Sequence, residues 1–92
     1  MKRAILPPDF REKLRSLPKE LRREIGVAIT DLEGGFGEPH RHRGLGIRAL
    51  RDDYFEIRIG LKLRLVFRNI PQGLVCEMIG DHDDVKRFLK SR

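Results

Sequence analysis

Apolar residues near the start of the chain recur at intervals of three and four, the spacing of one helical face. This pattern predicts a short helix over residues 9–16. Asp9 occupies the expected N-cap position after two prolines, and Glu12 follows three residues later in the spacing of a capping box. The apolar positions of this segment are Phe10, Leu14 and Leu17.

A second, longer amphipathic helix is expected after Pro18, a residue that suits the first turn of a helix. Its apolar stripe is interpreted as core, and the neighbouring Arg22 and Arg23 as a solvated face. Gly34 and Gly35 are expected to end it. The two helices together predict a helical hairpin. The stripe consists of Leu21, Ile25, Ala28, Ile29 and Leu32.

Residues 34–46 differ from the segments on either side. They contain five glycines, two histidines and two arginines, and almost no core material. We expect a loop here, and loops held on a rigid scaffold often carry binding or catalytic residues.

From Ile47 the period of the pattern changes from helical to two, which is typical of strands. Two alternating runs flank Gly60 and predict an antiparallel hairpin. Both apolar sets lie on one side of the sheet only if the loop has an odd number of residues, and a three-residue loop at 59–61 satisfies this. The apolar sets are Phe55, Ile57 and Ile59 on the first strand and Leu63, Leu65 and Phe67 on the second.

This hairpin also predicts which charged residues lie across from each other. With the loop centred on Gly60, Arg58 lies opposite Lys62 and Glu56 lies opposite Arg64. One polar side of the sheet then carries a carboxylate and three cations, and Glu56 offsets part of the repulsion.

The last quarter of the chain predicts a turn, a buried strand and a helix. Residues 71–73 carry a turn signal, and the mostly apolar residues 74–80 are typical of a buried strand. Residues 81–84 supply an N-cap and first-turn acids for the final helix. The whole pattern predicts one α+β domain over residues 1–92: an N-terminal helical hairpin packed on one side of a four-stranded, mainly antiparallel sheet, with a short C-terminal helix. The positions of the C-terminal helix that are expected to face the core are Val85, Phe88 and Leu89.

Charge narrows the choice of partner. Twenty Lys and Arg residues against 14 Asp and Glu give a net charge of +6, which favours nucleic acid, the ribosome or an acidic protein segment, although many small proteins are simply basic. The single Cys76 cannot form an internal disulfide, and no apolar run reaches the roughly 18 residues of a membrane span. We therefore expect a cytoplasmic protein.

The sequence lacks complete motifs for binding metals, nucleotides or cofactors. His40 and His42, together with His82 and its neighbouring aspartates, could supply zinc-type ligands, but the sequence has no CxxC or HExxH pattern. Neither GGFG nor GLGI has the flanking strand and helix of a phosphate-binding loop. We expect no metal and no cofactor.

The order of these segments resembles the RelE/ParE superfamily of bacterial toxins over nearly the whole chain. The matching motifs are PHRHRGLGIRAL at 39–50, RLVF at 64–67 and IGDHDDV at 79–85. Each motif is weak alone, and their order and spacing carry the resemblance. It implies a fold of two helices packed against a curved antiparallel sheet, in agreement with the pattern above.

The resemblance also implies a function. It indicates a toxin that a cognate antitoxin neutralises. Many members cleave mRNA in the ribosomal A site without a metal, and we expect a metal-free endoribonuclease of this kind, an mRNA interferase. The alternative is a ParE-like inhibitor of DNA gyrase without nuclease activity.

Four residues are implied as catalytic. Arg64 falls where the nucleases carry a catalytic arginine, and His82 falls where several members place a catalytic histidine. Glu56 and Arg58 lie on the strand where members carry basic or acid/base side chains. Guanidinium matches phosphate oxygens, and imidazole exchanges protons near neutral pH, so Arg64 suits a clamp on the phosphorane and His82 a proton carrier. A neighbouring Arg64 weakens Glu56 as a base, and an orienting role is favoured for it.

The remaining candidates are implied to bind RNA. Lys86 stands where nucleases of the family usually carry Tyr or Phe to stack on a base, a departure that favours the gyrase alternative. Tyr54 is the expected substitute for stacking. The predicted RNA-binding set is His40, Arg41, His42, Arg43, Arg48, Lys62, Tyr54 and Lys86.

Simpler interpretations of two residues stay open. Glu56 and Arg64 could form only a cross-strand ion pair, and His82 could be only a turn residue. An exposed strand edge beside a cationic surface predicts that the antitoxin supplies an extended, partly acidic segment that covers Arg58 and Arg64.

Overall fold

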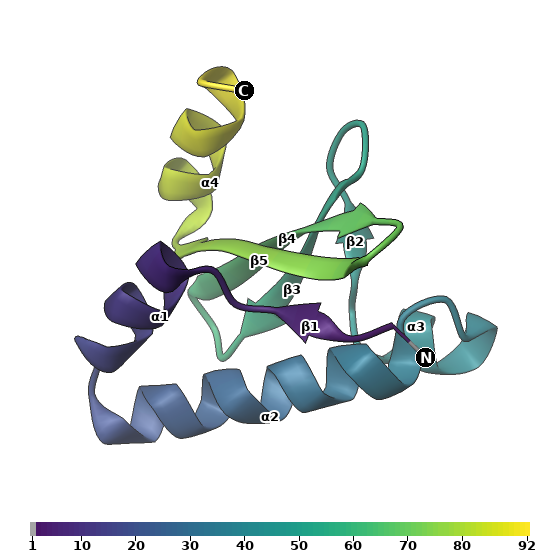
Figure 1. Cartoon of the computed structure of the whole chain (residues 1–92), viewed down its shortest axis with the longest axis horizontal. Helices are drawn as coiled ribbons and strands as arrows, with labels where there is room; N and C mark the ends of the chain where they lie inside the picture. The colour runs from purple at the N-terminus through teal and green to yellow at the C-terminus, as the bar shows by residue number, and fades with distance from the viewer. Residues whose placement is uncertain (1) are drawn as a thin grey trace.

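The computed structural model describes residues 2–92, which form a five-stranded sheet with helices on both of its sides. Figure 1 shows α2 on one side of the sheet and α4 on the other. The strand order is β1-β5-β4-β3-β2, with β1 parallel to β5 and all other neighbours antiparallel. The helices are α1 (Pro8–Arg15), α2 (Lys19–Gly35), α3 (Pro39–Gly44) and α4 (His82–Lys90). The strands are β1 (Ala4–Ile5), β2 (Arg48–Ala49), β3 (Tyr54–Ile59), β4 (Leu63–Ile70) and β5 (Gly73–Gly80).

The predicted α+β class and the N-terminal helical hairpin are confirmed, with two differences in the layers. The sheet has five strands rather than the predicted four, and the additional strand is β1. The helices do not all lie on one side, because α4 covers part of the opposite side. Both differences involve short elements at the ends of the chain.

The main core lies between the sheet and the N-terminal helices. The stripe on α2 packs against the odd-numbered residues of β3 and β4, as their alternation predicts. Ile25, Leu32, Leu65 and Phe67 are each fully buried. A smaller cluster lies on the other side, where Val85 of α4 packs with Tyr54 and Val66 and with the partly buried Leu50, Met78, Phe88 and Leu89.

The hairpin between β3 and β4 has the predicted parity but a different register. Its loop has three residues and includes Gly60, whose φ of 64° lies in the left-handed region. The loop is 60–62 rather than 59–61, so Ile59 pairs with Leu63 and stays buried. The predicted opposition of Arg58 with Lys62, and of Glu56 with Arg64, is therefore wrong.

The predicted N-cap is present at α4 but not at α1. Asp9 does not cap α1, because the helix begins one residue earlier with Pro8, and its N-cap, Pro7, has no side chain that could accept a hydrogen bond. At α4 the expected cap is present as a full capping box. The Asp84 N–H donates to Asp81 Oδ1 and the Asp81 N–H donates to Asp84 Oδ2, both at 2.9 Å. The bond from the Asp84 backbone lowers the pKa of Asp81 below its ordinary 3.8.

The expected loop at 34–46 contains a short helix. α2 runs through Gly34 and Gly35, and α3 then occupies Pro39–Gly44. A Cβ at Gly35 would lie 2.7 Å from Leu45 Cδ1, so the end of α2 and the residue after α3 pack closely. None of the helices within residues 2–92 has the length and apolarity that a bilayer crossing requires.

Cys76 lies in the core, and we expect it to be inert in the folded protein. Burial, together with the negative charges of Glu33 and Glu77, raises the pKa of the Cys76 thiol to about 12. Because the thiolate is the reactive form, labelling by a disulfide reagent at pH 8 should be at least about 100-fold slower in the native protein than in urea. Equal labelling rates in the two conditions would contradict the burial of this residue.

Candidate functional site

The candidate site lies on the side of the sheet that α4 partly covers. Glu56 on β3 is nearly buried, with 7% of its surface exposed. Its Oε2 lies 3.3 Å from Arg64 Nε and 3.8 Å from Arg48 Nε. Arg48 is directly opposite Glu56 on β2, whereas Arg64 reaches it diagonally from β4. One carboxylate therefore holds two arginines, each through Nε, on neighbouring strands.

Arg58 adds a further cation to this group. It lies directly across from Arg64, so two like charges occupy opposite positions on neighbouring strands, an arrangement that is unfavourable alone. The Arg58 side chain is exposed, whereas that of Arg64 is only 16% exposed. Glu56 compensates the charge that Arg64 brings into this half-buried position.

This arrangement predicts that Glu56 stabilises the fold as well as the site. Glu56→Gln keeps the size of the side chain but removes the charge between the arginines, so we expect the free energy of unfolding to fall by about 1–3 kcal/mol, with partial recovery at high salt. Chemical denaturation at two salt concentrations measures both effects. Glu20→Gln is the matched control, because Glu20 pairs with Arg23 where both side chains are more than 70% exposed. An equal loss in both variants would contradict the stabilising role of Glu56.

A hollow next to Arg64 brings His82 into the site. Gly80 on β5 pairs with Arg64, and His82 follows two residues later as the first residue of α4. The hollow has a volume of about 310 Å³. It is lined by Leu61, Lys62, Arg64, Asp81, His82 and Asp83. We call it the histidine hollow. Three of the predicted site residues thus lie around one concave surface.

A second hollow of about 310 Å³ lies on the other side of Glu56. It is lined by Gly44, Leu45, Gly46, Arg48, Glu56 and Arg58, and we call it the arginine hollow. The ion pair between Glu56 and Arg64 joins the two hollows, because Glu56 lines one and Arg64 lines the other. The result is a cationic surface whose charges are held in place by a buried carboxylate.

The residues of the α3 segment divide into exposed and structural ones. His40, Arg41 and Arg43 are exposed. His42 is half-buried, its Nδ1 accepts a hydrogen bond from the Gly37 N–H at 3.0 Å, and its ring lies 5.0 Å from that of Phe36. His42 therefore holds this segment together, and its expected role in binding RNA is not supported by its position.

The aromatic residues do not provide the expected stacking surface. Tyr54 is 9% exposed and packs edge-on against Phe88, with the ring centroids 5.6 Å apart. The prediction that Tyr54 stacks on a base is therefore wrong for this structure, because α4 covers the ring. Lys86 is exposed on α4, whereas Phe88 is half-buried with its ring against that of Tyr54. The chain has six aromatic residues, all within residues 2–92, and none of them is exposed there.

Three residues that line the histidine hollow were not among the predicted catalytic or RNA-binding residues. Asp81 and Asp83 flank His82, and Leu61 at the tip of the hairpin is 91% exposed. Their proximity to His82 in sequence was a signal for the aspartates, but nothing in the alternating pattern indicated Leu61. Across residues 2–92, no three His, Cys, Asp or Glu side chains come together as a possible metal site, so the considered zinc-type set of His40, His42, His82 and the aspartates beside His82 is not brought together.

Comparison with known proteins identifies the fold. No family model and no curated sequence matches the chain. Among solved structures, it is similar to a chain of the RelB–RelE antitoxin–toxin complex from Methanococcus jannaschii, with a TM-score of 0.66 and 14% identity over 91% of this chain and 96% of that one. It is also similar to a conserved hypothetical protein from Helicobacter pylori, with a TM-score of 0.54 and 19% identity over 90% and 97% of the two chains.

The chain therefore has a RelE-like fold. The resemblance to the RelE/ParE superfamily in the sequence is confirmed at the level of structure over about nine-tenths of the chain. At these identities the likeness establishes the fold alone.

Proposed function

We propose that this chain is the toxin of a toxin–antitoxin pair and that it cleaves mRNA without a metal ion, with the ribosome presenting the substrate. The observation that carries the proposal is the half-buried Arg64, held by Glu56 at 3.3 Å beside the hollow that contains His82. The RelE-like fold supports it, because many proteins of the family that the sequence resembles are ribonucleases.

We propose a role for each group. Cleavage requires a base to take the proton of the RNA 2′-hydroxyl as its oxygen attacks the adjacent phosphorus, a cation to stabilise the phosphorane, and an acid to protonate the leaving 5′-oxygen as its bond to phosphorus breaks. Arg64 supplies the cation, because Glu56 engages its Nε and leaves the terminal nitrogens for phosphate oxygens. Glu56 orients this arginine, and His82 carries the proton.

The exposed cations around this centre bind the RNA backbone. Arg58 adds positive charge beside Arg64, and Lys62 lines the same hollow as His82. Phosphate contacts of this kind fix the position of the RNA without reading its sequence. The further candidates for backbone binding are His40, Arg41, Arg43, Arg48 and Lys86, all of which are exposed.

A cognate antitoxin is the proposed partner. The similar Methanococcus jannaschii chain was solved in a complex of antitoxin and toxin. For this chain, we propose that an extended and partly acidic antitoxin segment covers Arg58 and Arg64. Charge reversal at both positions should then weaken antitoxin binding, and unchanged binding would contradict this part of the proposal.

Mapping of transcript ends tests the nuclease proposal. After brief induction of the chain in cells, primer extension should detect new 5′ ends within the translated region of a reporter mRNA. The same reporter without its start codon is the control, and its transcript should stay intact if the ribosome presents the substrate. New ends in both transcripts would overturn ribosome dependence, and growth arrest with intact transcripts would overturn the nuclease.

A ParE-like inhibitor of DNA gyrase is the second candidate function. Among the described residues 2–92, no exposed aromatic residue lies around His82 and Lys86, which favours this candidate because base stacking then lacks a side chain. In that case the purified chain should block supercoiling by gyrase at equimolar concentration and leave mRNA intact. Supercoiling that proceeds unchanged in the presence of the chain would exclude this alternative.

A further inference from the structure

The outer edge of β3 is only partly covered by β2. Arg48 and Ala49 of β2 pair with Glu56 and Phe55, and the chain turns away before this point at Gly46, which has a φ of 72°. Ile57, Arg58 and Ile59 therefore extend beyond the end of β2. Together with Gly60 they line a pocket against α2.

Backbone hydrogen bonds show which groups point to this edge. The Leu50 N–H donates to Tyr54 O and the Tyr54 N–H donates to Arg51 O, both at 2.9 Å, so Tyr54 directs its backbone toward the β2 side. The Asn69 N–H donates to Asp53 O at 2.8 Å, so Asp53, the residue before Tyr54, directs its carbonyl to the opposite side, toward β4. Every second residue repeats this orientation, and Arg58 thus presents its N–H and C=O outward. Within the described part of the chain, neither group of Arg58 has a partner on that side.

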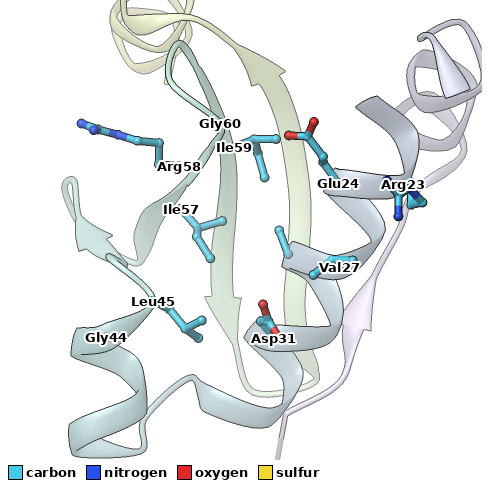
Figure 2. A pocket seen from close by; sticks show the side chains of 11 residues that line it. Arg23, Glu24, Val27, Asp31, Gly44, Leu45, Ile57, Arg58, Ile59 and Gly60 are labelled. Atoms are coloured by element: carbon cyan, nitrogen blue, oxygen red, sulfur yellow. The ribbon is translucent and has the colours of Figure 1, made fainter. Parts of the chain in front are cut away.

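Two hollows meet at this edge from opposite sides of the sheet. One is the arginine hollow. The other is a slot of about 430 Å³ between β3 and α2, which we call the α2 slot. Gly44, Leu45 and Arg58 line both. Figure 2 shows the Ile57 and Ile59 side chains directed between the strand and α2, whereas the Arg58 side chain points away.

The α2 slot has an apolar centre with a carboxylate at each end. Val27 is 57% exposed, which is high for an aliphatic residue, and it lies between Glu24 and Asp31 on α2. Among residues 2–92, neither carboxylate forms an ion pair. They are seven positions apart on the helix, a rise of about 10.5 Å. This acidic rim is unusual on a chain with a net charge of +6.

We propose that an extended segment of a partner protein adds to β3 as a strand beside Arg58 and inserts its side chains alternately into the two hollows. Successive side chains of a strand point to opposite sides, which matches two hollows on opposite sides of one edge. On the slot side, the segment presents an aliphatic residue flanked by two basic residues. On the other side it presents carboxylates to Arg48 and Arg58, which line the arginine hollow.

The dimensions of a strand fit this pattern. Residues i and i+4 of a strand are about 13 Å apart, and the long stems of Lys or Arg accommodate the difference from the separation of the two acids along α2. The central residue i+2 then lies over Val27 and Ala28.

If the proposed nuclease function is correct, carboxylates in the arginine hollow also obstruct the RNA site, and the partner is an inhibitor.

Two peptides of identical composition test the proposal. The probe is a labelled peptide with the core Lys-Glu-Ile-Glu-Lys between neutral flanks, and its control has the core Glu-Lys-Ile-Lys-Glu, which exchanges the charges between the two sides of the strand. Fluorescence anisotropy on the full chain should show about tenfold tighter binding of the probe than of the control. The combined variant Glu24→Lys with Asp31→Lys should abolish this preference. Asp9→Lys with Glu12→Lys, on exposed positions of α1, should leave it intact.

Amide hydrogen exchange tests the geometry of the bound segment. Saturation with the probe should slow exchange of the Arg58 N–H at least about tenfold, because strand addition engages that group.

Equal binding of the two peptides, no binding of either, or a preference that persists in the Glu24 and Asp31 variant would overturn the proposal. A protected slot with an unprotected Arg58 N–H would indicate a docked helix. A concentration-dependent dimer abolished by Val27→Gln would assign the slot to a second copy. None of these measurements involves RNA cleavage, so they are independent of the proposed nuclease.

Discussion

Replacing Arg64 with alanine is expected to slow RNA cleavage by about 10²–10³-fold, the usual effect of removing a group that stabilises developing charge. The Arg64 side chain is 16% exposed, and its Nε lies 3.3 Å from Glu56 Oε2, so this ion pair restrains the guanidinium before the substrate binds. Lysine keeps the charge but lacks the planar fork of donors, and Arg64→Lys should recover only part of the rate. Single-turnover cleavage of mRNA on purified ribosomes measures both variants.

The control for this experiment removes the same charge elsewhere. Arg22 is exposed on α2 and lines none of the hollows described above, so Arg22→Ala should change the rate less than twofold. Antitoxin binding and thermal stability should be measured for each variant, because Arg64 also pairs with Glu56. Equal losses for Arg64→Ala and Arg22→Ala would show that net charge matters rather than a specific clamp. Full activity of Arg64→Ala would exclude Arg64 from the reaction.

The hairpin illustrates how far the sequence determines structure. Alternation of apolar residues fixes parity, because a shift of one residue would turn every core side chain to the solvent. Alternation does not decide between registers that keep the same parity. Loops at 59–61 and 60–62 each have three residues and contain Gly60, so both satisfy the pattern. The second loop keeps Ile59 4% exposed and leaves Leu61 91% exposed. Weighing the burial of Ile59 against Leu61 would have been the only sequence signal for this choice.

The elements that the sequence did not predict are short or depend on distant partners. β1 has two residues and pairs with β5 about 70 positions later, so no alternating pattern could indicate it. His42 was assigned to RNA binding from the family resemblance, and the expected loop at 34–46 would have made it accessible. Its contacts with Gly37 and Phe36 depend on the turn that α3 makes, which the sequence did not reveal.

The candidate site was predictable in its strand residues and less so around α4. Glu56, Arg58 and Arg64 have the parity of the polar side, and the structure brings them together despite the different register. Tyr54 has the same parity and was therefore expected to be accessible. Val66 is the exception among these positions, an aliphatic residue between two arginines, and it marks the part of this side that α4 covers.

Replacing Gly73 with alanine is expected to lower the free energy of unfolding by about 2–4 kcal/mol and the melting temperature by about 10–25 °C. A Cβ at this position would lie 2.4 Å from the backbone oxygen of Arg3. That oxygen accepts a hydrogen bond from the Leu74 N–H at 2.8 Å beside β1, so it cannot move without weakening the edge of the sheet. Gly26→Ala is the matched control, because its Cβ would meet no atom within 4 Å on α2 and alanine favours a helix by about 0.5–1 kcal/mol. The same added methyl group should thus destabilise one site and stabilise the other in thermal denaturation. Similar shifts for both variants would contradict the close approach of the N-terminal segment to β5.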